Sequence, residues 1–180
     1  MNNLLKRLVN LSHPSLGTAL ICATLLAGAC SQNYTVAVNN QPVFDPTGRL
    51  FDGQLADADL QGCVNIAMQQ QNVQNAGLLS VLSCTNSEVG SLANIGQLTQ
   101  LRFVDLSNNN IRDLSALQRL RTLGGLNLMN NAITDIGPLL NMPNLVNVNL
   151  AGNNGISCEQ LQVLGERLRN NLTRPERCRS

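Results

Sequence analysis

The 180-residue sequence predicts a short right-handed α/β solenoid of about four turns, with parallel strands on its concave face and 3₁₀ or short helical turns on its convex face. Three observations support this fold class. The segment LRFVDLSNNNI from Leu101 recurs as LGGLNLMNNAI from Leu123, 22 residues later, and apolar residues alternate within each copy. Between the copies apolar residues recur every third position, and aromatic residues make up only 2% of the chain, which favours a core of stacked aliphatic rows.

The first segment has the layout of a secretory signal peptide, which we expect to span residues 1–29. Lys6 and Arg7 precede the uncharged run SLGTALICATLLAGAC, which ends in small residues. A membrane-spanning helix needs about 20 apolar residues, so this run is too short to span comfortably. We therefore expect the segment to be removed after export.

The end of this segment permits two kinds of cleavage at the same bond. Ala27 and Ala29 satisfy the small-residue rule of ordinary signal peptidase, whereas LAGAC resembles the lipobox of bacterial lipoproteins, in which Cys30 is acylated and becomes the first residue. The lipobox more commonly has Leu where this chain has Ala27. Among lipoproteins of Gram-negative bacteria, Ser31 after the acylated cysteine implies sorting to the outer membrane.

The number of cysteines favours acylation. Of six cysteines, Cys22 leaves with the signal peptide, and ordinary cleavage would leave five in an oxidising compartment. Acylation of Cys30 leaves an even number, with the alternative that Cys30 is a free or intermolecular thiol. The remaining four are Cys63, Cys84, Cys158 and Cys178.

Residues 30–50 follow as the lipidated N-terminus and a tether without periodicity, and residues 51–78 form the N-terminal cap. A solenoid exposes its apolar interior at both ends and needs such caps. In the cap, a helix is predicted around residues 55–68. One face of this helix carries Leu60, Cys63, Val64 and Ala67.

The repeats span residues 79–157, in four rows that begin at Leu79, Leu101, Leu123 and Leu145. Alternate residues of each row point inward from a short strand, and the residues between them point outward. The outward positions are Val81, Ser83 and Thr85; Phe103, Asp105 and Ser107; Gly125, Asn127 and Met129; and Asn147, Asn149 and Ala151.

A polar column opens each convex turn. Ser91, Asp113, Asp135 and Ser157 lie at 22-residue intervals, and all are good helix N-cap residues. Asp113 and Asp135 on neighbouring turns also suggest the carboxylate pair of a retaining glycosidase, in which the carboxylates stand about 5 Å apart. Capping is the interpretation that the period favours.

All four rows approximate LxxLxLxxNxL, which resembles the leucine-rich repeats of the 22-residue class found in bacterial internalins. The resemblance covers residues 79–157. It implies that Asn109, Asn131 and Asn153 lie inside the coil and bond the backbone of neighbouring turns. It also implies that the strand face is presented to a protein ligand.

Residues 158–180 form the C-terminal cap, in which Ser157 and Gln160 are expected to make a capping box. The following helix carries a covering stripe of Leu161, Leu164 and Leu168.

The cysteines predict one disulfide in each cap. Cys63 on the cap helix faces the first strand, where Cys84 fills an inward position, and Cys158 and Cys178 would tie down the C-terminal tail. Four reduced thiols and a Cys₄ zinc site are the alternatives. Zinc ligands normally come in close pairs of the CxxC kind, which these spacings lack.

Little in the sequence supports catalysis. Lys6 and His13 are the only lysine and histidine, and both leave with the signal peptide, which excludes a Ser-His-Asp triad, a Schiff base and a histidine metal site. The net charge of +1 does not suggest a nucleic-acid partner. We therefore expect no enzyme, cofactor or metal.

Two functions remain. The first is a membrane-anchored module, expected to be monomeric, that binds an unknown protein in the cell envelope and faces the periplasm or the cell surface. Its expected binding site is the concave face, which includes Phe103, Asp105, Asn127, Met129 and Asn149. The second is a structural envelope protein that binds anionic lipid or cell-wall polymer. Its binding residues would be the arginines of the C-terminal cap: Arg167, Arg169, Arg174, Arg177 and Arg179.

Overall fold

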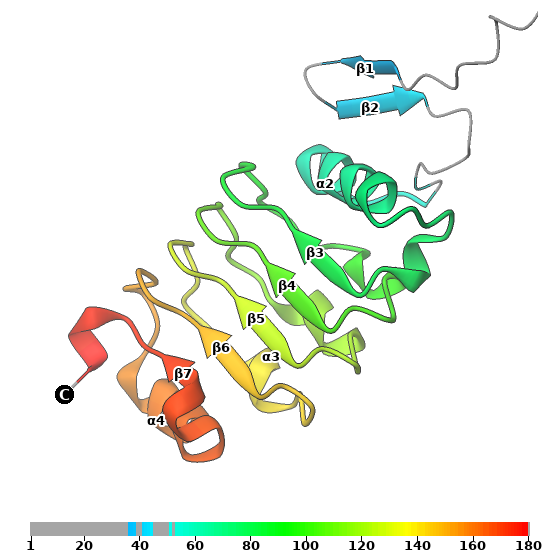
Figure 1. Ribbon diagram of the computed structural model, residues 1–180. Coiled ribbons are helices and arrows are strands. Elements are labelled where there is room, and N and C mark those ends of the chain that lie inside the picture. Colours follow the sequence, from blue (N-terminus) through cyan, green and yellow to red (C-terminus); the bar gives the residue numbers. More distant parts are fainter. Residues whose placement is uncertain (1–35, 39–40, 45–50, 52, 180) are drawn as a thin grey trace, which may run out of the picture. The chain divides into compact units, whose positions relative to one another are not determined.

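The structure, a computed structural model, describes residues 36–38, 41–44, 51 and 53–179 (Figure 1). The chain divides into two units, Met1–Tyr34 and Thr35–Ser180, and all described residues belong to the second. The expected signal peptide and Cys30 therefore lie outside the described residues. Among the helices that are described, none combines the length and apolar character needed to cross a membrane.

The centre of the fold is a parallel sheet of five strands in the order β3-β4-β5-β6-β7 (Figure 1). Residues 81, 103, 125 and 147 lie side by side in register, so each rung advances the chain by 22 residues. This arrangement confirms the predicted solenoid. The strands are β3 (Val81–Ser83), β4 (Phe103–Asp105), β5 (Gly125–Asn127), β6 (Asn147–Asn149) and β7 (Leu172–Thr173).

The opposite face carries short helical turns, as the three-residue period predicts. They are the 3₁₀ turns Ile95–Gln97 and Ser115–Arg119 and the single α-helical turn α3 (Gly137–Leu140). Of the predicted N-cap residues only Ser157 is one, at the start of the helix Cys158–Leu168; the N-caps of the other three turns are Asn94, Leu114 and Ile136. Each side chain of the predicted polar column nevertheless accepts a hydrogen bond from the backbone N–H two residues later. The bonds run from Ala93 to Ser91 (3.2 Å), Ser115 to Asp113 (2.8 Å), Gly137 to Asp135 (2.9 Å) and Glu159 to Ser157 (3.2 Å).

Columns of apolar side chains run through the core between the two faces. Because the repeat length is constant, each residue stacks on its counterpart one rung away, and the stacked side chains exclude water. Cys84 is 1% exposed, which places it in the inward column that the sequence assigned to it. Two further columns are Ile95, Leu117, Leu139 and Leu161, and Leu98, Leu120, Met142 and Leu164.

A ladder of three asparagines, of which Asn109 and Asn153 are buried and Asn131 is half-buried, closes the bends that follow strands β4, β5 and β6. The amide Nδ2 of Asn109 donates to the carbonyls of Cys84 (2.7 Å) and Leu106 (2.9 Å), while its Oδ1 accepts from the N–H groups of Ser87 and Val89. Each of these side chains therefore joins its own turn to the preceding one. Asn131 and Asn153 repeat the pattern. Asn131 donates to the carbonyls of Leu106 and Leu128, and Asn153 donates to the carbonyls of Leu128 and Leu150.

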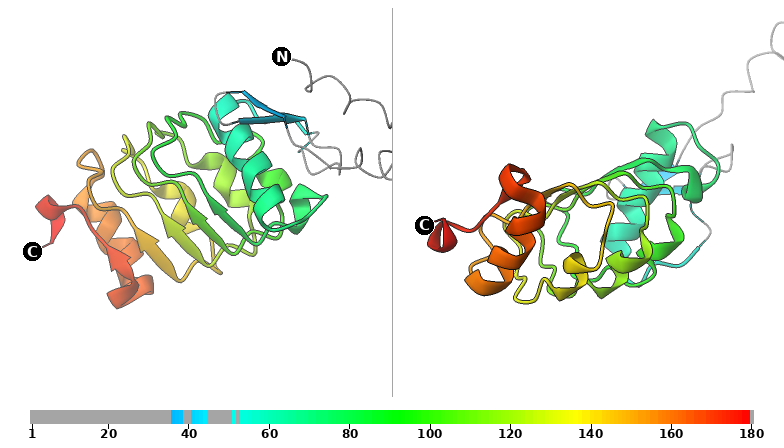
Figure 2. Two further views of the ribbon diagram at one scale, coloured as in Figure 1. Left: turned by 45° about the horizontal axis from the view of Figure 1, so that its top comes forward. Right: turned by 90° about the horizontal axis from the view of Figure 1, so that it is seen from below.

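The C-terminal cap is a modified fifth turn. Helix α4 (Cys158–Leu168) buries Leu161, Leu164 and Leu168, as the leucine stripe predicts. The chain then passes through the 3₁₀ turn Arg169–Asn171 into strand β7, which was not predicted, and ends in the turn Glu176–Cys178. Figure 2 shows α2 and α4 at opposite ends of the row of strands.

The predicted capping box is half correct: Ser157 has the predicted role, and Gln160 does not. Ser157 caps α4, but the Gln160 side chain reaches the preceding turn, where its amide donates to Asp135 (2.8 Å) and its carbonyl accepts from the N–H of Ile136 (3.4 Å). The Gln160 side chain therefore joins α4 to the preceding turn.

The N-terminal cap is helix α2 (Ala58–Gln70), followed by the 3₁₀ turn Ala76–Leu78. Asp57 joins this helix to the repeats, since its Oδ1 accepts from Asp59 and Leu60 in α2 and its Oδ2 accepts from Gly90 (2.8 Å) and Ser91 (3.0 Å). Although burial acts to raise the pKa of Asp57, these four N–H groups outweigh it and lower the pKa below 3.8.

Within the expected tether the structure contains an antiparallel hairpin of β1 (Val36–Val38) and β2 (Gln41–Phe44), with β2 beside α2. Its strands are short, and Pro42 within the second strand obscured the alternation by which a strand is recognised.

Replacement of Asp57 by Asn should lower the free energy of unfolding by about 1–2 kcal/mol at neutral pH, because an amide cannot accept from both sets of N–H groups. The lowered pKa fixes the sign of the pH dependence: the carboxylate's contribution is complete above pH 3.8 and is lost as the pH falls through the folded-state pKa. Urea unfolding of both proteins from pH 7 to pH 3 measures this, with exposed Glu166→Gln as the control. A difference that grows on acidification would contradict the assignment.

Replacement of Asn109 by Ala should lower the free energy of unfolding by at least about 3 kcal/mol, because two carbonyls and two N–H groups lose their shared partner inside the bend. The neighbouring Asn110 is exposed, so Asn110→Ala is a matched control with an expected change within about 0.5 kcal/mol. Denaturant titration followed by circular dichroism measures both, and equal losses would show that the ladder position has no special weight.

Candidate functional site on the concave strand face

The concave face is built from the outward side chains of strands β3 to β6, which the short parallel strands hold in rows and columns. It includes all five residues that the sequence assigned to a ligand site. Phe103 is exposed, and Asp105, Asn127, Met129 and Asn149 are half-buried. The structure thus brings these residues onto one surface, but their side chains differ in how far they are available to a ligand.

One polar column of this face closes the turns at the strand ends. The Oδ1 atoms of Asp105, Asn127 and Asn149 each accept from the backbone N–H two residues later, at 2.9, 3.2 and 3.1 Å. Asp105 Oδ1 also accepts from the Ser107 hydroxyl, and its Oδ2 accepts from Asn127 Nδ2 at 3.0 Å. Both oxygens of Asp105 and both polar atoms of Asn127 are therefore occupied by the protein itself.

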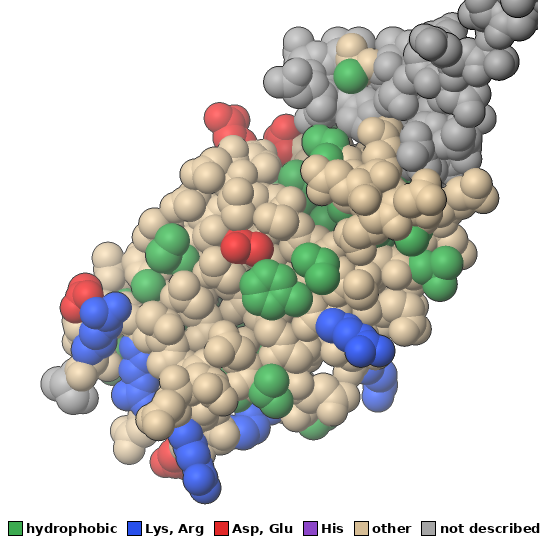
Figure 3. Space-filling model, viewed as in Figure 1, with side chains coloured by type: hydrophobic (Ala, Val, Ile, Leu, Met, Phe, Trp, Pro, Cys, Tyr) green, Lys and Arg blue, Asp and Glu red, His purple; other side chains and the backbone are tan. Residues whose placement is uncertain are grey.

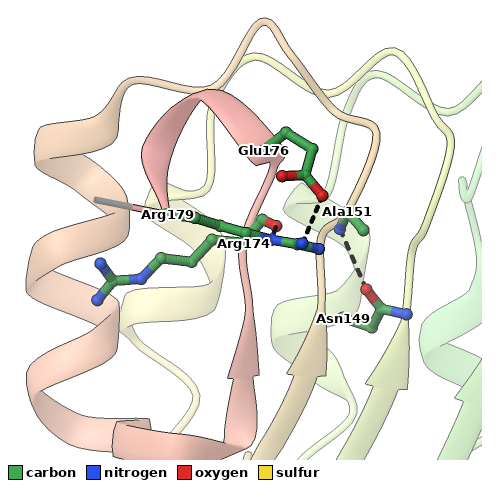
Figure 4. Close-up of polar contacts among 5 residues, drawn as sticks. All are labelled: Asn149, Ala151, Arg174, Glu176 and Arg179. Carbon is green, nitrogen blue, oxygen red and sulfur yellow. Dashed lines mark hydrogen bonds and ion pairs between the residues drawn. The ribbon is translucent and has the colours of Figure 1, made fainter.

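Asn149 retains a donor for a ligand. Its Oδ1 accepts from Ala151, and Figure 4 shows its amide nitrogen directed away from that bond. Within residues 53–179, neither this Nδ2 group nor the exposed side-chain amide of Asn147 has a hydrogen-bond partner. Because the turn bond fixes the orientation of Asn149, its free donor is held in place before any ligand arrives.

Two apolar side chains lie together on the same face. Val81 is 44% exposed and Phe103 is 42% exposed, and they are in register on neighbouring strands. The ring of Phe103 also leans over β5, where a Cβ at Gly125 would stand 2.7 Å from the ring carbon Cδ2. Figure 3 shows hydrophobic side chains gathered over the β3–β4 part of a largely polar face.

The turns above this face contain a column that sequence reasoning missed. Asn86, Asn108 and Asn130 adopt positive φ values of 54°, 57° and 54°, and Gly152 continues the column at 80°. Asn and Gly are the residues that tolerate this left-handed conformation, so their 22-residue spacing was the available signal. Asn130 also donates to the side chain of Asn108 at 2.8 Å, which links adjacent turns.

The cysteines lie at the two ends of the repeats. The structure contains the predicted disulfide between Cys158 and Cys178, whose Cα atoms are 5.4 Å apart. The expected disulfide between Cys63 and Cys84 is not formed: both are free thiols, and Cys63 donates to the Ser87 hydroxyl at 3.5 Å. This arrangement separates the four cysteines into two pairs, and among the described residues no cluster of three or more His, Cys, Asp or Glu could hold a metal.

The C-terminal arginines contact mainly the protein's own carbonyls. Arg167 donates to the carbonyls of Leu139 (2.9 Å) and Met142 (2.7 Å), and Arg177 donates to the carbonyl of Ile156. Arg179 pairs with Glu176 and donates to the carbonyl of Arg174 (Figure 4). These contacts satisfy carbonyls at the end of the solenoid, so three of the five arginines have a structural role.

A hollow of about 600 Å³ lies on the convex side, between the turns that contain Ser91 and Asp113. Both side chains are already engaged, since Ser91 accepts from the N–H of Ala93 and Asp113 accepts from the N–H of Ser115. The hollow lies between adjacent turns, and its lining also includes the polar side chains of Gln118 and Arg119.

Comparison with known proteins agrees with this architecture. A family model described as leucine-rich repeats (2 copies) matches residues 125–166. Among solved structures, internalin C2 from Listeria monocytogenes is 20% identical with a TM-score of 0.50, and the match covers 66% of this chain and 52% of that one. No curated protein matches the sequence.

Two further Listeria monocytogenes structures are similar at lower TM-scores. An internalin, InlF, is 23% identical with a TM-score of 0.38, over 62% of this chain and 44% of that one. The functional domain of InlJ, which includes a cysteine ladder, is 20% identical with a TM-score of 0.37, over 63% and 38%.

The chain thus spans about half the length of the internalin C2 structure that it matches. The 22-residue register, the asparagine ladder and the match to internalin C2 together show that residues 79–173 have the leucine-rich-repeat fold.

Proposed function

We propose that the protein is a membrane-anchored leucine-rich-repeat module that binds a protein ligand through its concave face, in the envelope of a bacterial cell. The observation that carries the proposal is the exposed pair Val81 and Phe103, held on the same rigid sheet as the unpartnered amide groups of Asn147 and Asn149. Aromatic anchors beside oriented hydrogen-bonding groups are typical of the energetic centre of protein interfaces.

The chemistry of the face predicts a ligand that is recognised without ion pairs. Asp105 is the one charged residue among the outward strand positions, and its carboxylate is already bonded to Ser107 and Asn127. A ligand would place an apolar side chain against Val81 and Phe103, and backbone or amide groups opposite Asn147 and Asn149. Since exposed charges are screened by salt and neutral hydrogen bonds are not, affinity should change little with ionic strength.

The proposed anchor rests on the sequence. LAGAC resembles a lipobox, and acylation of Cys30 leaves an even number of cysteines for an oxidising compartment. Several acyl chains, at about 0.8 kcal/mol per buried CH₂, would hold the protein stably at a membrane, and Ser31 favours the outer one.

The alternative, a structural protein that binds anionic polymer through its C-terminal arginines, has less support. Arg167 and Arg177 hold backbone carbonyls of the last turns, and Arg179 pairs with Glu176. Removal of these bonds to reach a phosphate or carboxylate would leave carbonyls at the end of the solenoid without partners.

Phe103→Ala should weaken ligand binding by at least about 1–2 kcal/mol, or roughly 5- to 30-fold in Kd, because it removes the apolar centre of the proposed interface. The ligand is first identified with a photo-crosslinking residue in place of Asn149 in the native envelope, and the same residue in place of Val163 is the control. Calorimetry with the purified ligand then compares Phe103→Ala with Val163→Ala, an exposed apolar residue on α4.

Equal effects of the two alanine variants, or crosslinks at position 163 alone, would remove the concave face as the site. Affinity that falls steeply with added salt would favour the arginine alternative.

Cys30→Ser should move the protein from the membrane fraction to the soluble fraction, because the acyl chains would have no attachment point. Fractionation, with incorporation of a palmitate analogue as the second readout, measures this. Cys22→Ser is the matched control, since that cysteine lies within the expected signal peptide and its loss should change neither readout. A wild-type protein found entirely in the soluble fraction after cleavage contradicts the anchor.

A further inference from the structure

The first repeat departs from the other three at two inward positions. Where later rungs have Leu106, Leu128 and Leu150, the first has Cys84, and where later rungs have Asn109, Asn131 and Asn153, it has Ser87. Both departures fall where helix α2, which contains Cys63, packs against the first rung.

Cys63 is accessible from the solvent and lies next to the part of the core that contains Cys84. Its Sγ donates to the Ser87 hydroxyl at 3.5 Å, and its side chain packs against the buried cluster that contains Cys84. Cys63 is half-buried and lines a groove of about 300 Å³ between α2 and β3, whereas Cys84 is 1% exposed and is absent from the groove lining. A molecule in the groove can therefore reach Cys63 before Cys84.

We propose that Cys63 and Cys84 are a thiol–disulfide exchange site, in which Cys63 takes up a mixed disulfide from a small disulfide in the groove and Cys84 displaces it. The inference does not depend on the proposed ligand-binding function, because it concerns the joint between the cap helix and the first strand.

The exchange has two steps. The Cys63 thiolate attacks one sulfur of a disulfide RSSR, which forms the Cys63–SR bond and releases RS⁻. The Cys84 thiol then gives up its proton, and its sulfur attacks Cys63 and displaces the second RS⁻ as the Cys63–Cys84 bond forms. The two cysteines lose two electrons to RSSR, which leaves as two thiols.

The surroundings of the two sulfurs indicate which cysteine reacts first. The hydrogen bond from Cys84, which outweighs burial, lowers the pKa of Cys63 from 9.0 to about 7, with a further contribution from Ser87. The carboxylates of Asp59 and Asp57 oppose this shift. The same bond to Cys63, together with burial and the charges of Asp105 and Asp57, raises the pKa of Cys84, so Cys63 is the more readily ionised of the two at neutral pH.

The test uses the purified protein, reduced and freed of reductant, and then treated with oxidised glutathione in native buffer. Peptide mass spectrometry follows the peptides that contain Cys63 and Cys84 separately from the Cys158–Cys178 pair. The wild type should end with Cys63 crosslinked to Cys84 and no retained glutathione, and Cys84→Ser should retain one glutathione on Cys63. Cys63→Ser should leave Cys84 unmodified until the protein is denatured.

A second readout keeps the test valid if one variant folds poorly. Cys84→Ala removes the donor to Cys63 whereas Cys84→Ser retains one, so alkylation of Cys63 at pH 7 should be about five- to eightfold slower in Cys84→Ala than in Cys84→Ser. This factor combines the smaller thiolate fraction with the greater nucleophilicity of a thiolate of higher pKa.

Three results would overturn the proposal: reaction of Cys84 in folded Cys63→Ser as fast as that of Cys63 in Cys84→Ser, stable glutathione on wild-type Cys63 without the crosslink, or equal alkylation rates in Cys84→Ala and Cys84→Ser.

Discussion

The asparagine ladder is the constraint on which the solenoid depends. Strands β3 to β6 are each only three residues long, and the chain then bends away from the sheet through a segment whose buried N–H and C=O groups cannot continue the strand pairing. One asparagine supplies both the donor and the acceptor that the bend needs, and it reaches the preceding turn as well as its own. This cross-turn bonding holds successive turns at a constant 22 residues, and the apolar columns can stack only because that length is constant.

The repeat itself made most of the fold predictable. Strands, convex turns, polar turn residues and inward columns recur at one spacing, so each rung predicts the same features in the next. The prediction failed where the spacing changes: β7 pairs with β6 at an offset of 24 residues, because helix α4 is longer than the convex turns before it. A two-residue strand has no periodicity of its own, and only its neighbour defines it. The hairpin of β1 and β2 was missed because its strands are short and Pro42 interrupts the alternation.

The binding face was predictable as a surface but not atom by atom. Alternation along the strands places Phe103, Asp105, Asn127 and Asn149 outward, and they are found there. Sequence alone did not show that the polar atoms of Asp105 and Asn127 are hydrogen-bonded to the turns and to each other. The bond between the two side chains depends on the register of neighbouring strands. The usable hydrogen-bonding groups therefore lie at one end of the amide column, at Asn147 and Asn149.

The two ends of the solenoid differ, and the difference bears on the binding face. At the C-terminal end, α4 continues the apolar columns and the Cys158–Cys178 disulfide fixes the tail. At the N-terminal end, β3 pairs with β4 alone among the described strands, and Gln71, the C-cap residue of α2, donates to the carbonyl of Val81 at 2.8 Å. Each rung of a solenoid is stabilised only by its neighbours, so opening is easiest at a terminal rung. Since Val81 forms half of the apolar anchor, the order of that anchor depends on how firmly α2 is held, through Asp57 and through the contact of Cys63 with Cys84.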